Sequence, residues 1–103
     1  MSQTDSSAEF GDLICEIHFA MPAAKRWSEL CRFLDGLRDH KVLTKCTRWQ
    51  RTELMSRHAR VIGAALVKRD PSLQPYADAL LARYPVPDDH MVAEELGAFA
   101  SLH

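Results

Sequence analysis

The side chains that most often carry out chemistry in proteins are scattered along this 103-residue sequence. Its five histidines fall on different segments, and none stands near a cysteine or a carboxylate at a spacing that a metal ion requires. The sequence has no glycine-rich phosphate loop, no GxSxG motif and no HExxH motif. We therefore expect no catalytic residue, no metal site and no cofactor, and we predict that the protein is not an enzyme.

The three cysteines predict neither a disulfide framework nor a zinc site. Cys15, Cys31 and Cys46 are odd in number and widely spaced. Free cysteine is among the most frequently buried residue types, so we expect three buried thiols.

Basic side chains are concentrated in one stretch of the chain. Residues 41–69 hold eight basic side chains and one acidic one, whereas the two flanking stretches are acidic and bring the net charge to −1. Such density suits phosphate binding, so a nucleic-acid interface is an alternative function. Its candidate residues are Arg48, Arg51, Arg57 and Arg60. However, these side chains point all around the expected helix, and no good helix-turn-helix pattern precedes them. We therefore favour the interpretation that the acidic segments neutralise the positive charge of this helix.

Apolar residues exceed what one small helical core can hide. The segment 10–21 distributes large apolar side chains around nearly its whole circumference, and Trp49 lies outside the main apolar face of its segment. Aromatic and apolar residues left at a surface usually mark an interface, and the commonest interface joins two copies of one chain. We therefore predict a homodimer and a protein-binding surface, with the candidate residues Ile14, Ile17, Phe19, Trp49 and Arg51.

The elements that must position these residues are helices. The longest is expected at about 47–69, where Thr47 and Gln50 form a possible capping box and Pro71 enforces the end. Apolar spacing predicts further helices over 22–38, 72–84 and 89–102. The fold class is therefore predicted to be all-α, a small bundle of four to five helices.

The segment 9–21 is open to two interpretations. Its apolar residues fit a helical spacing, but Leu13, Cys15, Ile17 and Phe19 also alternate as in a strand. We favour the helix, because no partner strand is evident and a lone strand cannot satisfy its backbone hydrogen bonds. A strand that pairs across a dimer would reverse this preference.

The chain has the length of one domain. Residues 1–8 are small and polar and predict a disordered tail, which leaves 9–103 as a single helical domain. No apolar run is long enough for a membrane span, and no signal peptide is evident at the N-terminus. We therefore expect a cytoplasmic protein.

Three stretches carry a resemblance to a known family. The run from Phe10 to Phe19, the run Ala24-Lys25-Arg26-Trp27 and the run Arg48-Trp49-Gln50-Arg51 resemble the QslA-type antiactivators of pseudomonads. The resemblance implies a helical homodimer that binds a LuxR-type quorum-sensing activator and blocks its dimerisation or its binding to DNA. It provides no motif from which functional residues can be assigned.

Together these observations predict a small regulatory protein that acts by protein–protein binding. The alternatives are a nucleic-acid-binding regulator that uses the basic helix 45–69, and an accessory subunit that folds fully only within a larger complex. The sequence leaves open the partner's identity, the dimer geometry and the division of apolar residues between core and interface.

Overall fold

The computed structural model describes residues 6–101, and within this range the chain is helical and contains no strand. The all-α prediction is confirmed, but with six α-helices where four to five were expected. A 3-10 turn at Pro71–Leu73 follows the longest helix. The helices are α1 (Ser6–Ala20), α2 (Ala23–Arg38), α3 (Lys41–Thr44), α4 (Arg48–Arg69), α5 (Gln74–Arg83) and α6 (Asp89–Ser101).

The predicted long central helix is α4, and its start follows from local chemistry. The Thr47 hydroxyl accepts a hydrogen bond from the Gln50 amide at 3.1 Å, and the Gln50 side chain accepts one from the Thr47 amide at 3.0 Å. This capping box satisfies two backbone donors that a helix start would otherwise leave open. At the other end, Pro71 follows Asp70, whose carboxylate accepts a hydrogen bond from the Ser72 amide.

The open choice for the segment 9–21 is settled as a helix. Helix α1 runs from Ser6 to Ala20 and packs along α4. It begins inside the tail predicted for 1–8, so Ser6 to Ala8 belong to the helix and not to a tail. Residues 1–5 lie outside the described residues.

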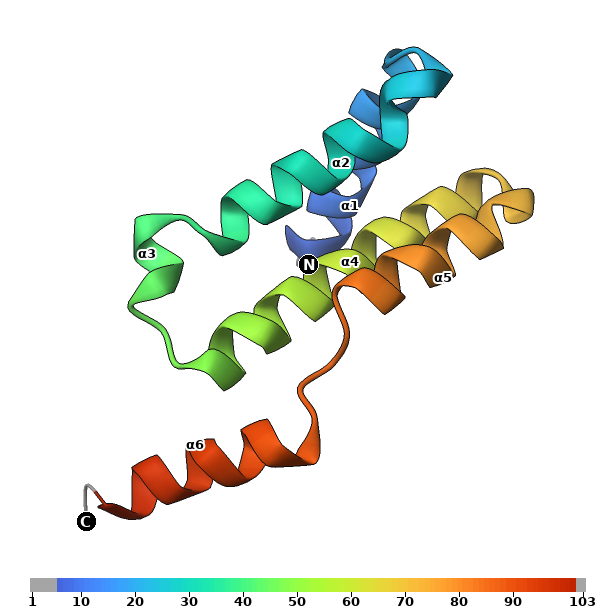
Figure 1. The fold of residues 1–103 in the computed structure, drawn as a ribbon. Coiled ribbons are helices and arrows are strands. Elements are labelled where there is room, and N and C mark those ends of the chain that lie inside the picture. Colours follow the sequence, from blue (N-terminus) through green and yellow to red (C-terminus); the bar gives the residue numbers. More distant parts are fainter. Residues whose placement is uncertain (1–5, 102–103) are drawn as a thin grey trace, which may run out of the picture.

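Helix α4 is the centre of the fold (Figure 1). Helices α1 and α5 pack against it, and α5 runs back alongside α4 after the 3-10 turn. Helix α2 closes the bundle over α1 and α4, while α3 turns the chain from α2 into α4. Helix α6 follows an extended linker and lies apart from the other helices, beside the N-terminal part of α4.

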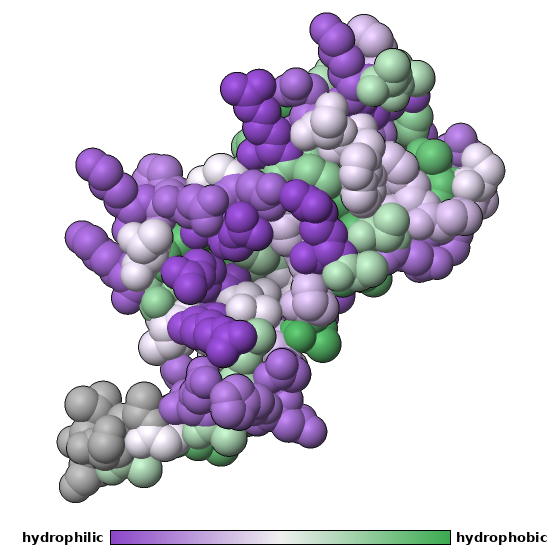
Figure 2. Space-filling model, viewed as in Figure 1, coloured by the Kyte–Doolittle hydropathy of each residue, from purple (hydrophilic) through white to green (hydrophobic). Residues whose placement is uncertain are grey.

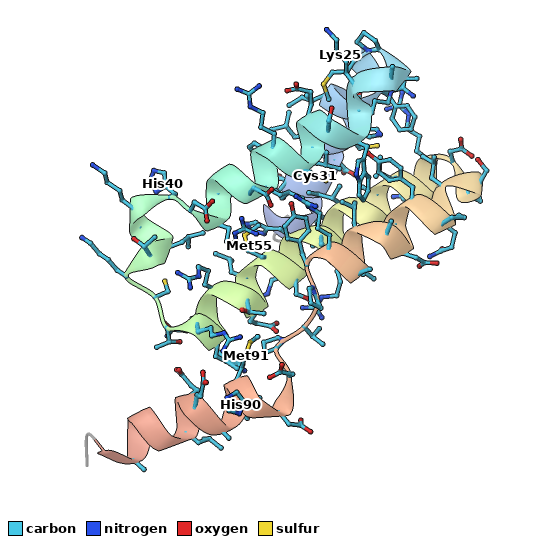
Figure 3. All side chains as sticks on the ribbon, viewed as in Figure 1. Lys25, Cys31, His40, Met55, His90 and Met91 are labelled. Atoms are coloured by element: carbon cyan, nitrogen blue, oxygen red, sulfur yellow. The ribbon has the colours of Figure 1, made fainter. Side chains whose placement is uncertain are left out.

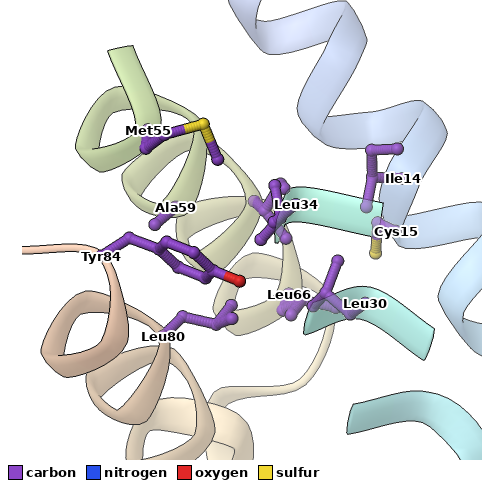
Figure 4. Close-up of a cluster of buried hydrophobic side chains, with 10 residues drawn as sticks. Ile14, Cys15, Leu30, Leu34, Met55, Ala59, Leu66, Leu80 and Tyr84 are labelled. Carbon is purple, nitrogen blue, oxygen red and sulfur yellow. The ribbon is translucent and has the colours of Figure 1, made fainter. Parts of the chain in front are cut away.

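The core lies where α1, α2, α4 and α5 meet, as Figure 4 shows. Its fully buried apolar side chains bring three helices together, with Leu34 on α2, Ile62 and Leu66 on α4, and Leu80 on α5. Burying side chains of this size contributes about 1.5–3 kcal/mol each to folding, which makes this cluster the main source of stability.

Two features were not predicted from the sequence. One is the short helix α3, which follows α2 and whose N-cap residue His40 accepts a hydrogen bond at Nδ1 from the Val42 amide. The other is in α6, where the apolar side chains of Val92 and Leu96 are both exposed. Periodicity predicted the helix correctly, but it could not show whether another element covers the apolar side.

Candidate protein-binding surface

Helices α1 and α2 together present an uncovered apolar surface. Leu13 is 58% exposed, Ile17 is 49% exposed, and Phe33 of α2 is 41% exposed. Between the helices lies a cavity of about 190 Å³, which we call the α1/α2 groove. It is lined by Ile14, Ile17, His18, Met21, Glu29, Leu30 and Phe33.

The turn between the two helices holds this groove in shape. The Arg26 guanidinium on α2 donates hydrogen bonds to the carbonyl oxygens of Met21 at 3.1 Å and of Phe19 at 3.4 Å. These carbonyls lie at the end of α1, where backbone acceptors lack partners within the helix. A cation near a helix C-terminus is also favoured by the helix dipole. Arg26 therefore fixes the angle at which α2 leaves α1.

His18 is the polar side chain at the bottom of the groove. It is only 3% exposed, and its ring meets those of Phe19 and Tyr76 edge-on at centroid distances of 5.5 and 5.2 Å. Burial, with a smaller contribution from the nearby Arg26 charge, lowers the pKa of His18 below 6.5. The imidazole is therefore neutral at physiological pH.

Two buried polar atoms in this region lack hydrogen-bond partners among the described residues. They are the Nδ1 atom of His18 and the hydroxyl oxygen of Tyr76. Burial raises the pKa of Tyr76 to about 12, so the phenol keeps its proton. An unsatisfied buried polar atom costs roughly 1–3 kcal/mol. A partner that offers His18 a polar group would remove part of this cost.

Of the predicted partner-binding residues on α1, only Ile17 is openly exposed. Ile14 is 8% exposed and belongs to the core cluster, so it forms part of the groove wall and is not an exposed contact residue. The ring of Phe19 is partly buried, with the guanidinium carbons of Arg69 and Arg26 at 4.5 and 5.2 Å from its centroid. Phe19 therefore helps to fix α1 against α2 and α4 through cation–π contacts.

Trp49 and Arg51 lie elsewhere in the molecule. Both belong to the N-terminal part of α4, and both are half-buried. Phe19 contacts Arg69 at the opposite end of this helix. Since a helix rises about 1.5 Å per residue, roughly 30 Å of α4 separates Trp49 from Arg69. The predicted partner-binding residues therefore do not form one surface but lie at two separate places in the protein.

The alternative nucleic-acid residues do not form one free basic stripe. Arg60 and Arg57 both pair with Glu53, at 3.1 and 3.9 Å, and Arg48 pairs with Glu94 of α6 at 3.6 Å. Arg51 instead lines a separate cavity. Figure 2 shows hydrophilic side chains gathered over α3 and the N-terminal part of α4. The ion pairs partly neutralise the charge that a phosphate backbone would need.

Within residues 6–101, no group of three or more histidine, cysteine or carboxylate side chains is close enough to hold a metal ion. In the same range, no helix combines the length and the apolar character needed to cross a membrane.

Phe33 is an exposed groove residue that was absent from the predicted set. The helical spacing of Leu30, Leu34 and Leu37 indicates one apolar side of α2, and Phe33 falls outside that stripe. A large aromatic residue beside a buried stripe is a usable signal for a surface contact. Which neighbouring helix lies next to Phe33 depends on the tertiary structure.

Comparisons of the chain with protein-family models, with curated proteins and with solved structures found no match.

Proposed function

We propose that this protein is a non-enzymatic regulator that binds another protein through the α1/α2 groove. The observation that carries the proposal is the exposure of Ile17 and Phe33 at one cavity, with the exposed Leu13 about one helical turn from Ile17 on α1. Large apolar side chains that gather at one site on a surface usually mark an interaction site. A partner that buries them would gain free energy from each, since removing apolar area from water contributes about 25 cal/mol per Å².

The geometry suits a partner that docks an amphipathic helix. Two helices joined by a tight turn offer a groove between them, and an apolar helix face fits such a groove through side chains spaced three or four residues apart. The cavity of about 190 Å³ has room for one large apolar side chain. Glu29 at its edge offers a carboxylate to a basic group of the partner.

The resemblance of the segments 10–19, 24–27 and 48–51 to QslA-type antiactivators supports a specific partner class. We propose that the partner is a LuxR-type quorum-sensing activator, which this protein sequesters. The proposal includes a homodimer in the cytoplasm. Helix α6 offers a second apolar stripe, Val92 and Leu96, so that two copies can associate without covering the groove.

The experiment is a pull-down of the tagged protein with a LuxR-type activator, performed with and without nuclease. The variant Ile17→Glu places a charge on the groove at a position that already meets solvent, so we expect it to fold and to lose the activator. The matched control is Val42→Glu, because Val42 is exposed on α3, away from the groove. This variant should retain the activator.

Two results would contradict the proposal. A folded Ile17→Glu variant that retains the activator would exclude the groove as the binding surface. Loss of every partner after nuclease treatment would instead favour the nucleic-acid alternative, whose binding should fall steeply with salt concentration. Light scattering after size exclusion tests the homodimer independently of the activator.

A further inference from the structure

A second cavity shares no lining residue with the α1/α2 groove. It has a volume of about 190 Å³ and is lined by residues of α2, α4, the end of α5 and the start of α6. Arg38, Arg51 and Arg83 line it from three different helices. Met55 and Met91, labelled in Figure 3, contribute from α4 and α6. We call this site the arginine-rimmed cavity.

Two of the three arginines are already bound to carboxylates. Arg83 donates a hydrogen bond to one oxygen of Asp35 at 2.7 Å, and Arg38 lies 3.4 Å from the other oxygen of Asp35. Arg38 also pairs with Asp39 at 3.1 Å. Arg51 has no carboxylate within ion-pair distance among the described residues. The three guanidinium groups therefore exceed the two carboxylates by one positive charge.

The remaining walls of the cavity are mostly apolar. Met55 and Tyr84 are each 3% exposed, and Pro85, Met91 and the polar Thr52 complete the lining. The Tyr84 hydroxyl is held on Asp35 at 2.8 Å, so this polar group is already satisfied. An engineered apolar cavity of about 150 Å³ binds benzene, which sets the size of an apolar body that such a space can hold.

We propose that the arginine-rimmed cavity binds a small carboxylic acid with a compact aromatic or branched apolar body. The carboxylate binds the Arg51 guanidinium, whose planar arrangement of donors matches two carboxylate oxygens. The apolar body packs between Met55 and Met91. Because Met91 belongs to α6 and Pro85 to its linker, the bound acid fastens α6 to the rest of the protein.

The test is a titration of the isotope-labelled full chain followed by amide NMR spectra, with sodium benzoate as the probe. We expect saturable shifts at Met55, Tyr84 and Met91. Benzamide has the same aromatic ring without the negative charge, and inorganic phosphate has a negative charge without the ring. If the charge and the ring both contribute to affinity, each control ligand should bind at least about tenfold more weakly than benzoate. Absence of saturable shifts with benzoate, or equal binding of either control ligand, would overturn the proposal.

Variants locate the site. Arg51→Met keeps most of the side-chain stem and should weaken benzoate binding about tenfold or more, because it removes a charge-assisted hydrogen bond. Arg51→Lys keeps the charge but loses the planar donor pair, so its affinity should fall between those of Arg51→Met and the wild type. The control Arg57→Met removes the same charge from an exposed position on α4 and should bind like the wild type.

Unchanged binding in Arg51→Met and Arg51→Lys would place the ligand elsewhere and refute this assignment. The proposal is independent of the protein-binding function, since Ile17→Glu should bind benzoate normally.

Discussion

Gly11 lies where α1 comes closest to α4. A Cβ atom at this position would lie 2.7 Å from the Val61 side chain and 2.9 Å from the Val61 carbonyl oxygen. Neither distance is compatible with normal packing, and a backbone atom cannot move aside as a flexible side chain can. The close crossing of α1 over α4 therefore depends on a glycine at this position.

We predict that Gly11→Ala destabilises the protein by about 1–3 kcal/mol, as overpacking of a helix crossing does. The matched control is Gly36→Ala in α2, where no atom lies within 4 Å of the added methyl group. Alanine is the better helix former, so this control should stabilise the protein by roughly 0.5–1 kcal/mol. Urea unfolding followed by circular dichroism measures both changes. Equal effects of the two substitutions would show that the α1–α4 contact is looser than described.

Tyr84, which is buried, and Tyr76, which is partly buried, differ in the hydrogen bonding of their hydroxyl groups. The Tyr84 hydroxyl donates to Asp35 at 2.8 Å and accepts a hydrogen bond from Arg83 at 3.2 Å, whereas the Tyr76 hydroxyl has no partner among the described residues. Burial raises the pKa of Tyr84 to about 12. Burial alone would raise the pKa of Asp35 as well, but hydrogen bonds from Tyr84 and Arg83 outweigh that effect and lower it.

We predict that Tyr84→Phe lowers the free energy of unfolding by about 1–2 kcal/mol, because it removes one of the hydrogen bonds to the partly buried Asp35 carboxylate and leaves only those from arginine. Tyr76→Phe removes a hydroxyl that makes no hydrogen bond among the described residues, so it should leave the free energy of unfolding unchanged or raise it by up to roughly 1 kcal/mol. Chemical denaturation of the two variants in parallel tests the contrast. A larger loss for Tyr76→Phe than for Tyr84→Phe would contradict the hydrogen-bond arrangement.

At the scale of elements, α4 and α6 differ most. Helix α4 buries Met55, Ala59, Ile62 and Leu66 against its neighbours. Helix α6 leaves Val92 and Leu96 exposed and lies beside only one end of α4 (Figure 1). Most helical stability in proteins comes from packing of an apolar face, and Val92 and Leu96 of α6 contribute little of such packing.

We predict that the amide protons of α6 exchange with solvent much faster than those in the middle of α4. Opening of α6 exposes little additional apolar surface, whereas opening of α4 requires global unfolding. Hydrogen–deuterium exchange at low protein concentration measures the difference. If the protection of α6 amides from exchange rises with protein concentration, a second copy covers the apolar stripe of α6, as the proposed homodimer requires. Protection equal to that of α4 at every concentration would contradict the expected difference.

At the scale of the whole molecule, two histidines make stability depend on pH. Burial lowers the pKa values of His18 and His58 below 6.5, with smaller contributions from Arg26 and Arg57. As the pH falls, the unfolded chain therefore takes up protons before the folded chain does. Proton uptake that favours the unfolded state reduces stability.

We predict that the free energy of unfolding decreases as the pH is lowered from about 7.5 to 5.5, the range in which an unfolded histidine becomes charged. His18→Phe keeps an aromatic ring between Phe19 and Tyr76 and should make this dependence weaker. Asp35 affects stability in a separate, more acidic pH range. Because its pKa in the folded protein is lowered from 3.8, the stability that it contributes is lost as the carboxylate becomes protonated at low pH. An equally steep decrease in His18→Phe would exclude His18 as a source.

Much of the helical structure follows from local rules. Thr47 and Gln50 define the start of α4 and Pro71 enforces its end, as predicted, and Asp88 accepts a hydrogen bond from the Met91 amide at the start of α6. These signals depend on neighbours within a few residues, so the sequence alone contains them. The prediction of a helix for 9–21, which was based on the lack of a partner strand in the sequence, is likewise confirmed.

Only the tertiary structure decided which apolar residues are buried. Ile14 and Ile17 are alike in type and lie three positions apart, yet one belongs to the core and the other meets solvent. Arg38, Arg51 and Arg83 are distant in sequence and line one cavity. Both outcomes depend on how separate helices pack, and helical periodicity constrains one helix at a time. The sequence thus determined where most helices begin and end, whereas packing determined which of their faces remain free to bind.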